Sequence, residues 1–258
     1  MPIFFLILLI FSTSCKQNSS ESELHITNGV LDDNEYPAVV QIHTEADGSC
    51  TGTFIRGNVL LTAAHCVIEG QIEGQPVVIE SLTSKPKSTD IFIHKRFETD
   101  ERVDAALVFF SEQLSLSPRE LEFTKPKVGE KVTFVGYGKN AYFEDGTSTG
   151  SGEKRVGRNN IVAFVENFFR IIGTPHAQPS PEGPTGENSS LGMGDSGGPA
   201  FNDQGKIIGI SAQGGRIEGR QYGHFTVMSV IKDFVEEALK LEEQQSKHTS
   251  LTGKLLQK

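Results

Sequence analysis

Tryptophan is absent from the 258-residue sequence, and cysteine and methionine occur only three times each. Basic residues are also scarce, because 24 Lys and Arg stand against 33 Asp and Glu, which gives a formal net charge of −9 at pH 7. A nucleic-acid-binding protein needs a basic face for the phosphates, and this chain has no dense run of Lys or Arg. We therefore expect no nucleic-acid partner.

The chain also lacks an apolar run that would span a bilayer comfortably. Its N-terminal run, Ile3 to Phe11, is too short for that but has the length of the apolar part of an export signal. Small residues then lead to Cys15, and a polar segment follows from Lys16 to Glu23. This pattern resembles a bacterial lipoprotein signal, in which Cys15 would be lipidated and become the new N-terminus.

We therefore expect a signal peptide over residues 1–15 and a polar leader or propeptide over residues 16–25. The protein would be exported, either as a periplasmic or cell-surface lipoprotein attached to the membrane through Cys15, or as a secreted protein. A plain secretory signal that leaves Cys15 free and an uncleaved anchor are the alternatives. The other cysteines are an even pair, Cys50 and Cys66. A disulfide between them fits an oxidising compartment, whereas two reduced buried thiols are the alternative.

Turn-forming residues are abundant, with 27 Gly and 11 Pro, and helical periodicity is absent until the C-terminus. This pattern predicts an all-β fold of short strands. The polar segment Ser117 to Gly129 predicts a crossover between two β-barrels of about a hundred residues each. Apolar residues at helical spacing from Ser229 to Leu241 predict a C-terminal helix packed on the second barrel. The folded domain would cover residues 26–241, and the polar tail 242–258 would fray.

The individual strands are expected where β-type runs occur between turn residues. A tight hairpin is expected at Gly57-Asn58. Residues 140–157 and 178–194 are rich in Gly, Ser and Pro and are expected to be loops. The expected strands lie within residues 36–44, 50–64, 77–81, 91–94, 105–110, 131–137, 161–165 and 168–172.

The strongest functional motif is Gly194–Pro199, which reads Gly-Asp-Ser-Gly-Gly-Pro. A serine hydroxyl is a poor nucleophile unless a base is in reach, and its carbonyl target needs backbone N–H groups aimed at the developing oxyanion. Glycines next to Ser196 let the backbone turn tightly and approach a substrate. The motif resembles the nucleophile segment of the chymotrypsin-like serine proteases. The resemblance implies that Ser196 attacks and that the N–H groups of Gly194 and Ser196 form the oxyanion hole.

Two further phrases extend this resemblance. Leu61–Cys66 reads Leu-Thr-Ala-Ala-His-Cys, and the family places its catalytic base in such a phrase, beside a cysteine that pairs with an earlier one. The resemblance implies that His65 is the base and that Cys66 pairs with Cys50. Asp104 opens an apolar strand, where a carboxylate is costly unless it has a partner. The order His65, Asp104, Ser196 is that of the chymotrypsin triad, so Asp104 is expected to orient His65.

The resemblance also implies a fold, an activation step and a specificity pocket. The fold would be two six-stranded antiparallel Greek-key barrels packed together with a C-terminal α-helix. A freed amine at Ile26 would insert and pair with Asp195, so the protein would be a zymogen. The primary pocket would have Ser190 at its floor and Gly214 and Gly223 in its walls. A neutral floor and open walls imply a preference for a large apolar or aromatic side chain.

One departure from the family lies beside this pocket. Ala212-Gln213-Gly214 stands where the family usually has Ser-Trp-Gly. The change removes a serine hydrogen bond expected to Asp104, and it alters the wall against which the substrate backbone lies.

Together these patterns predict a monomeric serine endopeptidase that cleaves protein or peptide substrates through an acyl-enzyme. The mechanism requires no cofactor and no metal. A non-catalytic homologue that acts as a binding protein at the cell surface is the alternative from another class. An esterase with the same nucleophile is a second alternative, but the order His, Asp, Ser is not that of the α/β-hydrolases.

Overall fold

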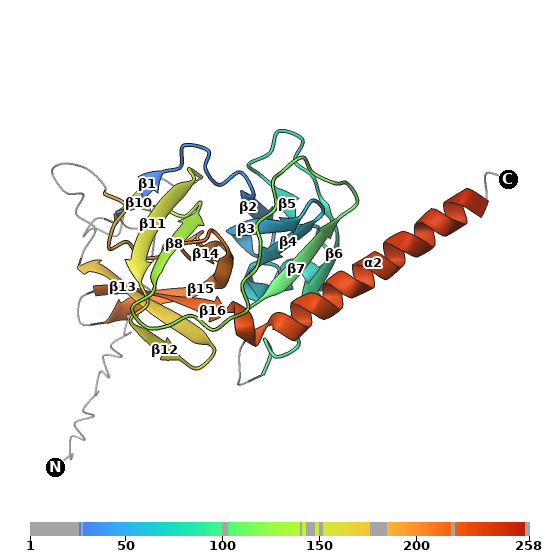
Figure 1. The fold of residues 1–258 in the computed structure, drawn as a ribbon. Coiled ribbons are helices and arrows are strands. Elements are labelled where there is room, and N and C mark those ends of the chain that lie inside the picture. Colours follow the sequence, from blue (N-terminus) through green and yellow to red (C-terminus); the bar gives the residue numbers. More distant parts are fainter. Residues whose placement is uncertain are drawn as a thin grey trace, which may run out of the picture.

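The computed structural model describes residues 26, 28–99, 103–139, 141–142, 148–149, 152–175, 185–217 and 220–255. The expected signal and leader, with Cys15, lie outside these residues. Strands dominate the described part and form two main sheets that lie side by side, with a long helix at the C-terminus (Figure 1). The all-β class expected from the sequence is confirmed.

The first sheet has six antiparallel strands in the order β5-β2-β3-β4-β7-β6. Its two edge strands meet again, because Val78 bridges Lys87 and the Ser88 N–H donates to the Val77 carbonyl oxygen at 2.9 Å. The sheet thereby closes into the first barrel. Its strands are β2 (Val39–Thr44), β3 (Gly48–Arg56), β4 (Val59–Thr62), β5 (Val78–Ile79), β6 (Ser88–Ile93) and β7 (Ala106–Phe110).

The second sheet has eight strands in the order β1-β11-β8-β14-β15-β16-β13-β12. Strands β11 and β13 touch, and the Asn159 side chain donates to the Ile172 carbonyl oxygen at 2.9 Å, so this sheet also curls. The two short edge strands, β1 and β12, account for the difference from the six strands expected. The strands are β1 (Val30–Leu31), β8 (Lys131–Gly136), β11 (Arg155–Asn160), β12 (Ala163–Val165), β13 (Phe168–Pro175), β14 (Pro199–Phe201), β15 (Ile207–Ile217) and β16 (Arg220–Val227). A separate hairpin pairs β9 (Ala141–Tyr142) with β10 (Ser148–Thr149).

Most expected strands are present, and the turn at Gly57-Asn58 joins β3 to β4. Strand β11 was missed, because its sequence Arg-Val-Gly-Arg-Asn-Asn has no hydrophobic alternation. Pairing with β8 over its whole length and the burial of Arg155 and Asn159 make it a strand. Strands β14, β15 and β16 were also not expected individually. The crossover 117–129 has no strand, only an isolated bridge from Leu121 to Ile207.

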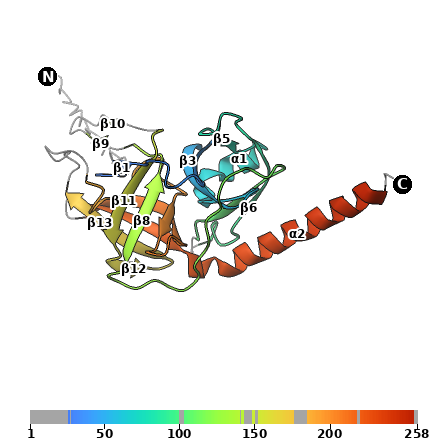
Figure 2. The ribbon, with the colours of Figure 1, turned by 45° about the horizontal axis from the view of Figure 1, so that its top comes forward.

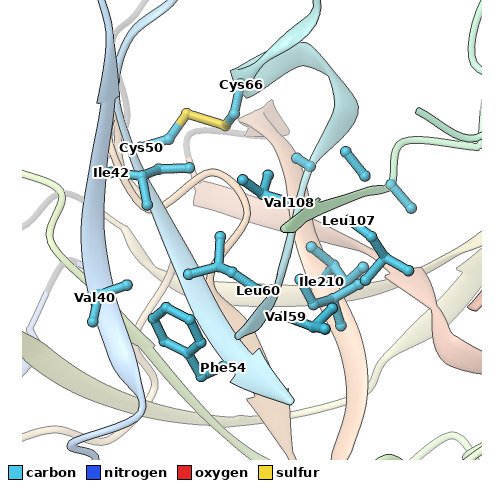
Figure 3. Packing of buried hydrophobic residues seen from close by; sticks show 14 of the residues in the cluster. Val40, Ile42, Cys50, Phe54, Val59, Leu60, Cys66, Leu107, Val108 and Ile210 are labelled. Carbon is cyan, nitrogen blue, oxygen red and sulfur yellow. A yellow bond between two sulfur atoms is a disulfide. The ribbon is translucent and has the colours of Figure 1, made fainter. Parts of the chain in front are cut away.

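The disulfide joins β3 to the short 3₁₀ helix η1 (Ala64–Cys66). Cys50 and Cys66 are bonded and buried, so their pairing is confirmed and the alternative of two thiols is wrong. Figure 3 shows the bond at the edge of a packed apolar cluster that includes Ile42 and Phe54. The short helix α1 (Ile68–Ile72) follows η1 directly. The segment that carries His65 is thus tied to the first barrel by a covalent bond.

The C-terminal helix α2 (Lys232–Leu255) follows the 3₁₀ helix η2 (Met228–Val230). The expectation that it packs on the second barrel is wrong. Its Phe234 ring lies 5.0 Å from the ring of His94, and the Asn58 side chain donates to Glu242 at 3.1 Å, so it packs along the first barrel. Helical periodicity shows that one face is apolar, but it does not show which neighbour covers that face.

Helix α2 is also longer than expected. Residues from 242 onward, expected to fray, are helical as far as Leu255, in keeping with the good helix propensity of Glu, Gln and Lys. The distal half projects away from both barrels in the two views (Figures 1 and 2). In the described part of the chain, no helix is both long enough and apolar enough to cross a membrane.

Candidate active site

The expected catalytic residues come from both barrels. His65 lies on η1, directly after β4, and Asp104 lies just before β7, the neighbour of β4 in the first sheet. Ser196 lies in the loop before β14 of the second sheet. This loop reaches the first barrel, because the Thr51 N–H donates to the Ser196 carbonyl oxygen at 2.8 Å. The candidate site therefore lies where the two barrels meet.

His65 and Asp104 are hydrogen-bonded twice. The His65 backbone N–H donates to Asp104 Oδ1 at 3.1 Å, and His65 Nδ1 lies 2.6 Å from Asp104 Oδ2. Burial by itself lowers the pKa of His65, but the hydrogen bond and negative charge of Asp104 outweigh burial, so the pKa is raised. Since a carboxylate only accepts hydrogen bonds, Nδ1 carries a proton and the lone pair of neutral His65 is on Nε2. That nitrogen is able to accept a proton.

The loop around Ser196 leaves two N–H groups without an acceptor in the part of the chain that the structure describes: those of Gly194 and Ser196. Gly194 has φ +96°, a conformation that glycine adopts without strain. The loop is held in place by the Thr51 side chain, whose hydroxyl donates to the Gly194 carbonyl oxygen at 2.7 Å. Two fixed N–H donors next to a serine hydroxyl are able to stabilise an oxyanion.

Asp195 is fully buried beside this loop. Its carboxylate accepts backbone N–H groups of Gly138 at 2.9 Å and of Gly192 at 2.7 Å, and a third from Ile26, which is itself 1% exposed. Burial raises the pKa of Asp195 to about 7, although these hydrogen bonds oppose the rise. The structure therefore brings the expected activation pair, Ile26 and Asp195, into contact.

The pocket of Asp195 depends on two glycines that the sequence analysis missed. A Cβ added to Gly136 would lie 2.1 Å from Asp195 Oδ1, and one added to Gly138 would lie 2.7 Å from the same oxygen. Both positions therefore require glycine for the close approach of the carboxylate. The Gly-Tyr-Gly sequence at 136–138 is the only local signal that could have indicated them.

The expected pocket residues also come together. Gly214 on β15 is the partner of Gly223 on β16, and the buried Ser190 hydroxyl has no hydrogen-bond partner among the described residues. However, the wall at Gly223 is not open. Leu191 lies against it, so that a Cβ added to Gly223 would be 2.7 Å from Leu191 Cγ. The walls are neutral and apolar, with less room than two glycines suggest.

A cavity of about 420 Å³ opens beside His65 and Asp104. Two aromatic rings and a small apolar side chain form one part of its wall, and two carboxylates, one carboxamide and one imidazole form the rest. Its lining comprises His65, Asp104, Phe97, Glu166, Phe168, Ala212 and Gln213. Such a mixed, partly apolar hollow is able to hold a side chain of a bound peptide next to His65.

Three potential metal ligands, Cys50, His65 and Cys66, have ligand atoms within 4.8 Å of one another. The two sulfur atoms are joined in the disulfide, and a metal ligand requires a free thiolate. A single histidine remains, and one side-chain ligand does not make up a protein metal site. This cluster is therefore unsuited to a metal.

Comparisons with known proteins agree with this geometry. The family model described as Trypsin matches residues 30–235. Snake venom serine protease 3 of Protobothrops jerdonii is 28% identical over 148 residues, which cover 54% of this chain and 57% of that protein. A Corynebacterium glutamicum protein named as a peptidase is 26% identical over 185 residues, 70% of this chain and 59% of that protein. The chain thus spans less than three fifths of each of these relatives.

Solved structures show the same fold. The scabies mite inactivated protease paralogue S-D1 superimposes with a TM-score of 0.65 at 16% identity, covering 83% of this chain and 97% of that one. A Glu endopeptidase superimposes with a TM-score of 0.60 at 15% identity, covering 81% of this chain and 95% of that one. Both similarities concern the arrangement of the two barrels.

Proposed function

The chain belongs to the trypsin family of serine proteases, and from this premise we propose that it is a serine endopeptidase with a triad of Ser196, His65 and Asp104. The observation that carries the proposal is the double hydrogen bond between His65 and Asp104, which leaves Nε2 available as a base. The N–H groups of Gly194 and Ser196 have no acceptor among the described residues, which supports their proposed role as the oxyanion hole, the second requirement of acyl transfer.

The proposed reaction has two stages. In the first, His65 Nε2 takes the proton of the Ser196 hydroxyl while the oxygen attacks the peptide carbonyl, and the oxyanion is bound by the Gly194 and Ser196 N–H groups. His65 then gives the proton to the leaving amine, and an acyl-enzyme remains. In the second stage, His65 takes a proton from water while the hydroxide attacks the ester carbonyl. His65 then returns the proton to the Ser196 oxygen as the bond to the acyl group breaks, and the acid product leaves. No cofactor or metal takes part in these steps.

We also propose which substrate side chain the protein prefers on the amino side of the cleaved bond. We assign the binding of this side chain to Ser190, Gly214 and Gly223, and the absence of a charged group among these three residues supports a preference for an apolar side chain. The sequence indicates a large or aromatic residue there. The contact of Leu191 with Gly223 adds a size limit, so the preference between aromatic and branched aliphatic residues depends on Leu191.

Activation before Ile26 is part of the same proposal. In the described structure the Ile26 backbone N–H already bonds to buried Asp195, and cleavage before Ile26 would convert this amide into an ammonium group. A positive charge there would hold the carboxylate ionised and fix the Ser196 loop. The disulfide supports export to an oxidising compartment, with Cys15 as the proposed lipid attachment site.

The test uses purified protein whose chain starts at Ile26. This protein is treated with a fluorophosphonate probe, and the Ser196→Ala variant serves as the control. Peptides that differ only at the cleaved residue, carrying Ala, Val, Leu, Phe, Lys or Glu, measure the pocket preference. We expect labelling that is absent in the control and cleavage that is fastest after apolar residues. A folded protein that starts at Ile26 and remains unlabelled would contradict the proposal and favour the non-catalytic binding homologue.

A further inference from the structure

Three polar side chains lie on neighbouring strands beneath the cavity: Arg170 on β13, His224 on β16 and Gln213 on β15. His224 is the cross-strand partner of both Arg170 and Gln213. Strand β16 lies between β13 and β15 in the second sheet (Figure 1). Arg170 Nε donates to His224 Nε2 at 2.8 Å, and the Gln213 carboxamide lies 3.1 Å from His224 Nδ1. The mechanism proposed above uses none of them. Gln213 also lines the cavity and is exposed.

The hydrogen bond from Arg170 determines which ring nitrogen of His224 carries the proton. A guanidinium group only donates hydrogen bonds, so His224 Nε2 must accept and carries no proton. Burial first, and the charge of Arg170 second, lower the pKa of His224 to about 4, so the ring is neutral. The single ring proton is therefore on Nδ1. Phe168 stacks on the ring, with centroids 5.6 Å apart and planes 4° apart, and restricts its rotation.

This proton determines how the Gln213 carboxamide is oriented. The closest contact joins Gln213 Nε2 to His224 Nδ1, but two N–H donors do not form a hydrogen bond. Rotation of the carboxamide by a half turn about its last bond exchanges nitrogen and oxygen at no change of shape. In that orientation Oε1 accepts from His224 and the NH₂ group is directed away from it. Gln213 therefore offers hydrogen-bond donors to the cavity.

The rest of the cavity lining limits what these donors can bind. Phe97, Phe168 and Ala212 provide apolar contacts, and Glu166 provides a carboxylate. An acidic side chain would be repelled by Glu166, and an aliphatic one would leave the Gln213 donors unsatisfied. A substrate side chain that ends in a primary carboxamide fits both groups. Its carbonyl oxygen accepts from the Gln213 NH₂ group, and its own NH₂ group donates to the Glu166 carboxylate.

We propose that Gln213 is a specificity-determining residue, whose carboxamide, oriented by Arg170 and His224, binds a glutamine or asparagine side chain of the substrate in the cavity beside His65. This inference rests on the proposed function only in that the ligand is a peptide bound across the site. Arg170 and His224 act as positioning residues, because they reach the substrate only through Gln213.

The test measures binding rather than cleavage. Fluorescent peptides are titrated into Ser196→Ala protein that starts at Ile26, with Gln, Met, Glu or Lys placed in turn at the second, third and fourth positions on the amino side of the cleaved bond. We expect Gln to bind about 5- to 10-fold more tightly than Met of similar size at one position, the effect of one good hydrogen bond.

Two test variants, each with a control variant, examine the mechanism in the same Ser196→Ala background. Gln213→Glu presents only acceptors, so the carbonyl oxygen of a substrate Gln loses its donor; the preference for Gln over Met is expected to shrink and Lys to bind best. Gln204→Glu, an exposed residue in a turn of the second barrel, adds the same charge elsewhere and should leave the ranking unchanged. Arg170→Met frees His224 to change tautomer and should reduce the Gln preference about 3-fold or more, whereas Arg170→Lys, which still donates, should retain most of it.

Equal affinity for Gln and Met at every position, an unchanged ranking in Gln213→Glu, or no binding of any peptide would overturn the inference. The fluorophosphonate test is separate. If the Ser196→Ala protein prefers Gln peptides but the parent protein is not labelled, the endopeptidase proposal is disproved and this inference stands. If the parent protein is labelled but all peptides bind with equal affinity, the endopeptidase proposal stands and this inference is disproved.

Discussion

Asp104 contacts His65 through both carboxylate oxygens, at 3.1 Å to the backbone nitrogen and at 2.6 Å to Nδ1. One contact fixes the position of the 3₁₀ turn that carries the histidine, and the other fixes its tautomer. The serine that the family usually supplies as a further partner of this aspartate is replaced by Ala212. In this chain, the orientation of His65 therefore depends on these two bonds to a greater degree.

Replacement of Asp104 by Asn should lower kcat/KM by about 10³- to 10⁴-fold, because the tautomer of His65 is then no longer fixed. The charge of Asp104 raises the pKa of His65, and burial lowers it. Without that charge the pKa of His65 should fall, so the acidic limb of the kcat/KM profile should move to lower pH. A pH series on peptide hydrolysis measures both effects.

The matched control for this variant is Asp203→Asn, at an exposed turn residue. It should change neither the rate nor the pH profile. An acidic limb that stays in place in Asp104→Asn would show that another group titrates.

The stability of the uncleaved protein should fall as the pH rises from about 4 to above 7. Asp195 has an ordinary pKa of 3.8 and is raised to about 7 in the folded chain, mainly by burial. Between these values the folded state binds more protons than the unfolded state, so the free energy of unfolding decreases with pH. In protein that starts at Ile26, the ammonium group should hold the carboxylate ionised and remove most of this loss.

Urea unfolding at pH 5 and pH 8 measures this difference in both forms. In uncleaved protein, the free energy of unfolding of the Asp195→Asn variant should depend much less on pH, since an amide does not titrate. Equal pH dependence of the two natural forms would contradict the proposed pairing of Ile26 with Asp195.

Removal of the disulfide by Cys50→Ala with Cys66→Ala should lower the free energy of unfolding by about 3 kcal/mol, as expected for a closed loop of this length. Denaturant unfolding of the double variant gives the value. Wild-type protein unfolded in dithiothreitol serves as the comparison and should show a similar loss. A loss well below about 1 kcal/mol would indicate that the barrel alone holds the segment.

Leu191→Ala should change the pocket preference. Removal of the side chain that lies against Gly223 enlarges the pocket, so the ratio of kcat/KM for Phe over Val at the cleaved residue should rise roughly tenfold. Peptide pairs that differ at this residue provide the measurement.

Since Leu191 is buried, the variant should also lose about 2–5 kcal/mol of stability. Leu60→Ala, equally buried in the first barrel, controls for this loss and should leave the ratio unchanged. An unchanged ratio in Leu191→Ala would show that the side chain does not limit the pocket.

Local patterns in the sequence were sufficient for most strands of the first barrel. The resemblance to a family gave the pairing of Cys50 with Cys66, which the structure contains, and led to the proposal of His65, Asp104 and Ser196 as the triad. These features depend on short sequence segments, because hydrophobic alternation, turn residues and motif spacing each extend over a few positions. The sequence of strand β11 has no such local pattern. It forms a strand because it pairs with β8 over its whole length.

The tertiary structure decided the features that join distant segments. It placed α2 on the first barrel, Gly136 and Gly138 around Asp195, and Leu191 against Gly223. These contacts depend on how each barrel closes and how the two pack, and the residues involved follow no common periodicity. The sequence alone determined which residues we propose for the chemistry, whereas the size and polarity of the space around them were decided only by the packing of side chains far apart in the chain.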